Sequence, residues 1–192
     1  MLIKYKNKGF SLIEALVAIT VLVFGIIGPL TLAQMSLRSF PQIRDRITAE
    51  YLAAEGMEVI KNIRDEALIK DPGSGFPNFT PCQGAQGCYV DATQPDYFEF
   101  VGGSWKLKNG TLTVCPVSCP KIKYYAANGS YNYSSGVDQV FTRRIFITVG
   151  NITTSGATGE KALVRVRVEW PSRFIGTESV EFSSYLTDWF RF

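Results

Sequence analysis

The sequence contains no histidine, and only 19% of its 192 residues are charged. Histidine is the side chain best suited to proton transfer near neutral pH and is the most common metal ligand, so its absence argues against an enzyme or a metal protein. We find no serine or threonine in a recognisable nucleophile turn, and any such nucleophile would lack its usual base. The sequence therefore predicts a protein that is not an enzyme and has no cofactor.

The chain also lacks a large excess of one charge. Lysine and arginine number 20 against 17 acidic residues, which gives a formal net charge of +3. Lys4, Lys6 and Lys8 supply that excess, so the rest of the chain is formally neutral and has little electrostatic drive toward phosphate groups. Hydrophobic residues make up 46% of the chain. Length and composition therefore predict one folded domain with a core, not a disordered chain or a multidomain enzyme.

The most informative feature is a long apolar run near the start of the chain. No lysine or arginine occurs between Lys8 and Arg38, and Glu14 is the only charged residue from Gly9 to Leu37. A helix from Phe10 to Leu37 would be about 40 Å long, enough to cross a bilayer. Because the lysines precede the run, the positive-inside rule places the N-terminus in the cytoplasm and the residues after the run outside it.

Three hypotheses compete for this segment. A cleaved secretory signal has a short apolar region and a site of small residues, but this run is long and offers only Thr31-Leu32-Ala33. A plain signal anchor leaves Glu14 unexplained, because a carboxylate in an apolar span costs roughly 2.5 to 3.5 kcal/mol near its centre and usually has a partner. The third hypothesis supplies that partner.

The lysine-rich leader is followed at residues 8–14 by KGFSLIE, which opens the apolar run. This stretch resembles the N-terminal signal of type IV pilins and type II secretion pseudopilins. The resemblance implies that a prepilin peptidase cuts between Gly9 and Phe10 and that the new amino group of Phe10 is methylated. It also implies that Glu14 pairs with this amino group on a neighbouring subunit. In a low-dielectric setting such a pair penalises a mismatched register more than it adds net stability, so Glu14 would set the axial register.

The same resemblance implies the function and the location. It implies a structural subunit of a type IV pilus-like filament; the alternatives are a minor pseudopilin of a type II secretion system and a tip adhesin or DNA-binding minor pilin. Such a subunit is a single-pass protein of the inner (cytoplasmic) membrane, in contact with lipid, until a membrane assembly platform and an ATPase add it to an extracellular or periplasmic filament. Its partners are the prepilin peptidase, this machinery and other pilins, with nucleic acid as a partner only in the DNA-binding alternative.

The sequence divides into a leader (1–9), a transmembrane and filament-core helix (10–37), an amphipathic helix (38–70) and a β-rich head outside the membrane (71–192). Gly28 and Pro29 predict a kink or a locally melted stretch in the first helix, and Pro41 predicts a bend or a restart. The amphipathic helix has apolar residues at helical spacing, which predicts a core-facing stripe. These residues are Leu52, Gly56, Val59, Ile60, Ile63 and Ala67.

Three strands are predicted near the C-terminus, at Phe141–Val149, Ala162–Trp170 and Val180–Leu186, and together they form an antiparallel meander. The second alternates strictly, so its apolar residues should face the core and its charged residues the solvent. The inward residues are Val164, Val166, Val168 and Trp170. A helix laid on such a sheet gives an α+β fold, in which a long N-terminal helical spine packs on an antiparallel β-sheet. This arrangement resembles the globular part of pilins.

Two β-hairpins are predicted from Asn-Gly pairs, one over Trp105–Val114 and one over Tyr124–Tyr133. The tyrosines of the second hairpin are a candidate adhesive patch, although strand packing is the favoured interpretation. The arginines of the C-terminal strands are a candidate basic strip for DNA, with a solvated strand face as the favoured interpretation. They are Arg143, Arg144, Arg165, Arg167 and Arg173.

Four cysteines admit three pairings. An export route favours oxidation, and we favour the two local bridges, Cys82 to Cys88 and Cys115 to Cys119. A four-cysteine zinc site is the alternative, but the chain lacks the usual C-x2-C spacing for it.

Overall fold

The computed structural model describes residues 11–71, 76–93, 97–108, 110–154, 157–172 and 176–187, without the side chains of 152–160. In these ranges the helices are α1 (Leu12–Lys70) and α2 (Thr80–Gln83). The strands are β1 (Cys88–Tyr89), β2 (Phe98–Val101), β3 (Ser104–Leu107), β4 (Thr113–Val114), β5 (Lys121–Tyr125), β6 (Ser130–Asn132), β7 (Val137–Thr154), β8 (Ala157–Pro171) and β9 (Thr177–Thr187). The chain forms two compact units, residues 1–44 and residues 45–192, and α1 contributes to both.

Helix α1 is helical from end to end and contains both Pro29 and Pro41. Each proline removes one helical hydrogen bond, but the bonds on either side keep the backbone in the helix. The locally melted stretch at Gly28 and Pro29 and the restart at Pro41 are therefore not present. A kink or bend at these prolines stays a prediction.

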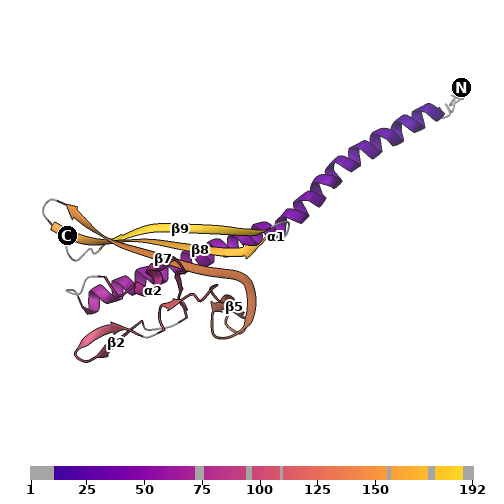
Figure 1. Ribbon diagram of the computed structural model, residues 1–192. Helices are drawn as coiled ribbons and strands as arrows, with labels where there is room; N and C mark the ends of the chain where they lie inside the picture. Colours follow the sequence, from indigo (N-terminus) through magenta and orange to yellow (C-terminus); the bar gives the residue numbers. More distant parts are fainter. Residues whose placement is uncertain are drawn as a thin grey trace, which may run out of the picture. The chain divides into compact units, whose positions relative to one another are not determined.

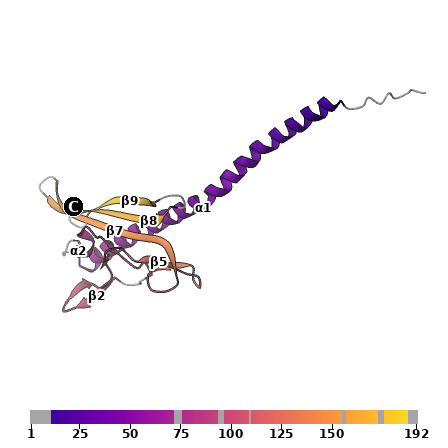
Figure 2. The same cartoon turned by 45° about the vertical axis from the view of Figure 1, so that its right-hand side comes forward.

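The second half of α1 forms the core of the head with the sheet. In Figures 1 and 2 it lies along β7, β8 and β9. All six residues of the predicted helical stripe are buried, from Leu52 to Ala67, which confirms that stripe. The sheet contributes Ile145, Ile147, Val164, Val166 and Val168, each at most 1% exposed. The alternation predicted for β8 is confirmed, because Arg165 and Arg167 on its other face are exposed.

The described pairings of the main sheet are all antiparallel. Strand β8 pairs with β7 on one side and with β9 on the other, which confirms the predicted meander. Strands β5 and β1 both pair with the other side of β7. Strand β6 then pairs with β5, and β4 pairs with β1. The long helix on an antiparallel sheet is the α+β arrangement that the sequence predicted.

One predicted hairpin is wrong and the other is confirmed. Strand β3 pairs with β2, with Val101 opposite Ser104, and not with β4, which pairs with β1. The turn is Gly102-Gly103, with φ of 65° and 85°. Two successive residues of positive φ are what a type I′ turn requires, and glycine adopts them without strain, so this signal prevails over Asn109-Gly110. The second hairpin forms as β5 and β6, with Tyr124 opposite Tyr131.

Gly56 lies where α1 packs closely on the sheet. A Cβ atom at this position would lie 2.9 Å from Cδ of Arg143 and 3.0 Å from Cγ1 of Val166. We expect Gly56→Ala to lower the free energy of unfolding by about 1 to 3 kcal/mol, because the buried neighbours must shift. Urea unfolding of the full chain in detergent measures this. Alanine favours helix by about 1 kcal/mol over glycine, so an unchanged or higher midpoint contradicts the close packing.

Candidate functional site

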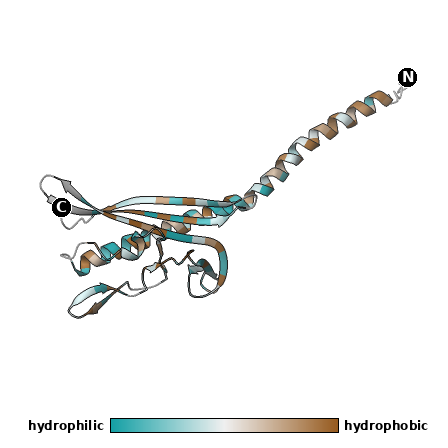
Figure 3. Ribbon diagram, viewed as in Figure 1, coloured by the Kyte–Doolittle hydropathy of each residue, from teal (hydrophilic) through white to brown (hydrophobic). Residues whose placement is uncertain are grey.

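The first half of α1 presents a continuous apolar surface. Every residue from Ser11 to Phe40 is exposed, and Figure 3 shows apolar residues recurring along this segment. Soluble monomers rarely expose contiguous apolar area of this extent. The helix also contains a window that is long and apolar enough to cross a membrane. This surface is therefore suited to lipid or to the apolar helices of other chains.

Glu14 lies exposed in the first turn of α1. The N–H of Ala15 donates to the carbonyl oxygen of Ser11 at 3.1 Å, so the helical bonding begins at Ser11. Ser11 and Glu14 have the spacing of a capping box, in which the two side chains satisfy free amides at the helix start. A carboxylate here also faces the positive end of the helix dipole. A local capping role thus stands beside the intersubunit role predicted from the sequence, and experiment can separate the two.

Comparison with known families matches residues 4–28 to the prokaryotic N-terminal methylation motif. The chain carries a type IV pilin or pseudopilin signal. The matched range includes Glu14 as well as Gly9 and Phe10, the predicted cleavage and methylation residues, which lie outside the described residues. No curated protein and no solved structure significantly matches the chain. The signal stands at the start of an α+β fold in which a long helix packs on an antiparallel sheet, which is a pilin-like arrangement.

The signal and the apolar helix also support anchoring of the chain in a membrane. A signal of this type is processed by a prepilin peptidase and precedes assembly with other pilins. In the described chain, the exposed apolar surface from Ser11 to Phe40 is available both for contact with lipid and for contact with the helices of other subunits.

The head contains two disulfides. They join Cys82 of α2 to Cys88 of β1, and Cys115 to Cys119 in the segment after β4. These are the local pairings favoured from the sequence. They use all four cysteines, so the four-cysteine zinc site does not form.

Arg143 does not belong to the predicted arginine strip, whereas Arg144, Arg165 and Arg167 lie on the outward face of the sheet, with Arg144 opposite Arg167. Arg143 is only 2% exposed, so both the DNA-binding and the solvated-face interpretations are wrong for this residue. It shares the inward face of β7 with Ile145 and Ile147, because alternate residues of a strand point the same way. Arg165 and Arg167 are exposed on the opposite face, where Nε of Arg167 lies 2.9 Å from the Glu169 carboxylate. Arg173 lies outside the described residues.

Arg143 holds three segments of the head together from inside the core. Its Nη1 donates to the Leu52 carbonyl at 3.0 Å and to Oε2 of Glu55 at 2.6 Å, while Nη2 donates to the Val90 carbonyl at 2.9 Å. Burial acts to lower the pKa of Arg143, but the net shift is upward because the neighbouring Tyr133 oxygen and Glu55 carboxylate favour the charged form. Burial raises the pKa of Tyr133. Arg143 is therefore a buried permanent cation.

Sequence reasoning missed this pair, although a signal for it was present. Glu55 lies three residues after Leu52 and four before Val59, which places it on the predicted core-facing stripe of α1. Arg143 is two and four residues before Ile145 and Ile147, so all three side chains point to the same face of the strand. Two opposite charges on two inward faces indicate an ion pair, which is buried at Arg143 and 37% exposed at Glu55.

The tyrosine hairpin is only partly available to a partner. The rings of Tyr124 and Tyr131 pack at 5.2 Å between centroids, and Tyr124 is 37% exposed. Tyr133 packs at 4.9 Å against Tyr89. The strand packing favoured from the sequence is thus present, and an adhesive role for the remaining exposed tyrosine surface stays a prediction.

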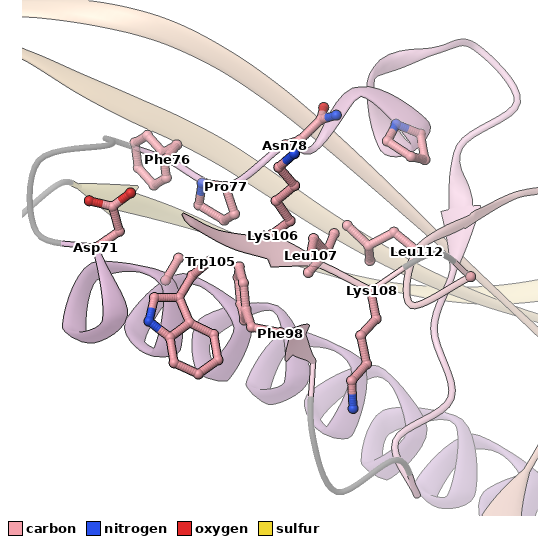
Figure 4. Close-up of a pocket in the computed structure, with 13 residues that line it drawn as sticks. Asp71, Phe76, Pro77, Asn78, Phe98, Trp105, Lys106, Leu107, Lys108 and Leu112 are labelled. Carbon is pink, nitrogen blue, oxygen red and sulfur yellow. The ribbon is translucent and has the colours of Figure 1, made fainter. Parts of the chain in front are cut away.

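A cavity of about 400 Å³ lies between the end of α1, the segment before α2 and the β2–β3 hairpin. Figure 4 shows Trp105 and Phe98 beside the end of α1, with Lys106 directed toward Asn78. Lys70 anchors the hairpin, since its Nζ lies 4.3 Å from the centroid of the Trp105 ring. Among the described residues that line this cavity, none places a nucleophile next to a base.

Proposed function

We propose that this protein is a structural subunit of a type IV pilus-like filament, cut between Gly9 and Phe10 and methylated at Phe10. The observation that carries the proposal is the methylation motif at residues 4–28, which includes the first part of an unburied apolar helix. Packing such helices against each other buries apolar area, at a gain of roughly 25 cal/mol per Å². Polymerisation through the first half of α1 is therefore the mechanism, and the role is structural and not catalytic.

The proposed location follows from the same segment. The N-terminus lies in the cytoplasm and the head lies outside the inner membrane, with the helix in lipid before assembly. A membrane platform and an ATPase then add the subunit to a periplasmic or extracellular filament. The two disulfides of the head support this placement, because disulfides persist in oxidising compartments.

A minor pseudopilin of a type II secretion system is the principal alternative, because pseudopilins share the signal. The DNA-binding alternative is weakened, since Arg143 lies in the core and Arg167 pairs with Glu169. A tip adhesin would use the exposed tyrosines of the β5–β6 hairpin.

The mass of the N-terminal peptide tests the proposal directly. Protein extracted from membranes of a host that carries its prepilin peptidase should begin at Phe10 and bear one added methyl group. A chain that retains Met1 would overturn the filament proposal and indicate a signal-anchored surface protein. A chain cut near Ala33 would indicate a secreted head.

A further inference from the structure

The cavity between the end of α1, the segment before α2 and the β2–β3 hairpin has an aromatic wall. Trp105 and Phe98 form this wall, and Figure 4 shows their rings on the side of α1. Trp105 is 38% exposed although Nζ of Lys70 lies over its ring. The indole surface that Lys70 does not cover is therefore available to a ligand in the cavity.

The aromatic wall is fixed before any ligand binds. Lys70, which lies over the Trp105 ring, is itself held by an ion pair with Glu66 on the same helix. The ring of Phe100 packs against Trp105 in an edge-on arrangement, with 5.3 Å between the centroids. A surface whose side chains are already ordered loses less conformational entropy on binding, so this wall is suited to a small ligand.

The side of the cavity across from this wall is polar. Figure 4 shows Asn78 and Lys106 there. Oδ1 of Asn78 accepts a hydrogen bond from the Thr80 N–H at 3.0 Å, which fixes the amide and leaves its Nδ2 donors. Within the described part of the chain, neither this Nδ2 nor Nζ of Lys106 forms a hydrogen bond or an ion pair. The Asp71 carboxylate also lines the cavity, so the polar side offers donors and an acceptor.

The charges around the cavity balance. Lys106, Lys108 and Asp71 line it, and Glu99 lies opposite Lys106 in the β2–β3 hairpin. Two cations and two anions favour neither an anionic nor a cationic ligand, so the lining suits an uncharged polar molecule. The volume of about 400 Å³ lies in the range of small-molecule sites.

We propose that this cavity binds one ring of an uncharged carbohydrate. A pyranose ring has an apolar C–H face, which packs on Trp105, and a rim of hydroxyl groups. The hydroxyl oxygens accept hydrogen bonds from Nδ2 of Asn78 and Nζ of Lys106, and one hydroxyl donates to Asp71. A wholly apolar ligand would instead leave these donors without water and without partners. The inference concerns residues 45–192 and does not depend on assembly through the apolar helix.

The test uses the full chain in a detergent without a sugar headgroup, because such a headgroup would compete for the cavity. The probes are three uncharged disaccharides: cellobiose, lactose and chitobiose. We expect at least one to bind saturably in calorimetry at concentrations up to about 10 mM, since the contacts of one ring supply weak binding. The same probe should shift the tryptophan emission. Digalacturonate, a disaccharide with two carboxylates, should bind no better.

Variants of two lining residues locate the site. Trp105→Ala should weaken binding about tenfold or more, because it removes the aromatic wall. Trp105→Phe keeps a ring, so it should keep binding within about threefold while the emission shift is lost.

Lys106→Ala removes one donor and should weaken binding about fivefold, whereas Lys121→Ala, at an exposed lysine of β5, should leave it unchanged. Circular dichroism and intact disulfides establish that each variant is folded.

Three results would overturn the proposal. Absence of saturable binding by all three uncharged disaccharides would mean that the cavity is not a carbohydrate site. Wild-type binding by both Trp105→Ala and Lys106→Ala would place the sugar elsewhere on the chain. Tighter binding of digalacturonate than of every uncharged probe would make the ligand an anion.

Discussion

Replacing Glu14 with glutamine should leave membrane insertion and cleavage intact and reduce incorporation into filaments by about tenfold or more. Glutamine keeps the size of the side chain and its capacity to cap the helix at this position, but it removes the charge that would pair with the amino group of a neighbour. A loss of 1.4 kcal/mol per subunit contact corresponds to a factor of about ten. The measurement is the ratio of the protein in sheared filaments to that in membranes, by quantitative immunoblot.

Two companion variants decide between the charge and the cap. Glu14→Ala removes both and should lose incorporation as severely as Glu14→Gln. Ser11→Ala removes only the other half of the predicted capping box and should have little effect on incorporation. If the glutamine variant assembles normally and the alanine variant does not, Glu14 acts as a cap. Normal assembly of both variants contradicts any role for this residue in register.

Replacing Glu55 with alanine should lower the free energy of unfolding by about 3 kcal/mol, because it leaves the Arg143 cation buried without its carboxylate partner. For a chain of this size the loss corresponds to a fall in the melting temperature of about 6 to 12 °C. Thermal unfolding of the full chain in detergent measures it. Glu58→Ala is the matched control on the same helix, since its exposed pair with Lys61, at 3.6 Å, contributes less than about 1 kcal/mol.

A double substitution tests the reason for this effect. Arg143→Met removes the buried charge and keeps much of the apolar volume, so adding it to Glu55→Ala should recover part of the lost stability. Simple addition of the two losses would show that Arg143 stabilises the head by packing alone and that the charge is irrelevant.

Hydrophobic periodicity was sufficient to predict an element where the burial of one apolar face was the only signal. The stripe from Leu52 to Ala67 and the alternation of Val164, Val166 and Val168 required only that apolar residues on one face be buried, and both predictions are confirmed. Similarly, the apolar run predicted a membrane-length helix because no other interaction competes with so strong a pattern.

Predictions failed where two signals competed or where a partner was distant in sequence. The strand at Trp105 is flanked by Gly102-Gly103 on one side and by Asn109-Gly110 on the other. Both pairs favour a two-residue hairpin turn, and local sequence alone does not show which turn is more stable. The sequence favours solvent for Arg143, because a charged side chain usually lies there. Its carboxylate partner, Glu55, is 88 residues away, and only the packing of α1 on β7 brings the two together.

At the candidate site the sequence was informative because the signal is a linear pattern. Residues 4–28 are read by their order, and their function needs no tertiary contact within the chain. The proposed register role of Glu14 is different, because it requires the amino group of a second subunit. A single ion pair between subunits leaves no periodic trace in the sequence of one subunit.

The contact between α1 and the sheet also has a mechanical consequence. Buried residues of α1 extend from Ala49 to Leu68, and Nη1 of Arg64 donates to the Thr187 carbonyl at 3.3 Å near the far end of this contact. A pulling force along the helix would therefore load the interface in shear, so that many contacts resist at the same time. A force perpendicular to the helix would instead peel them apart one after another. We expect the head to withstand tension along α1 far better than lateral force.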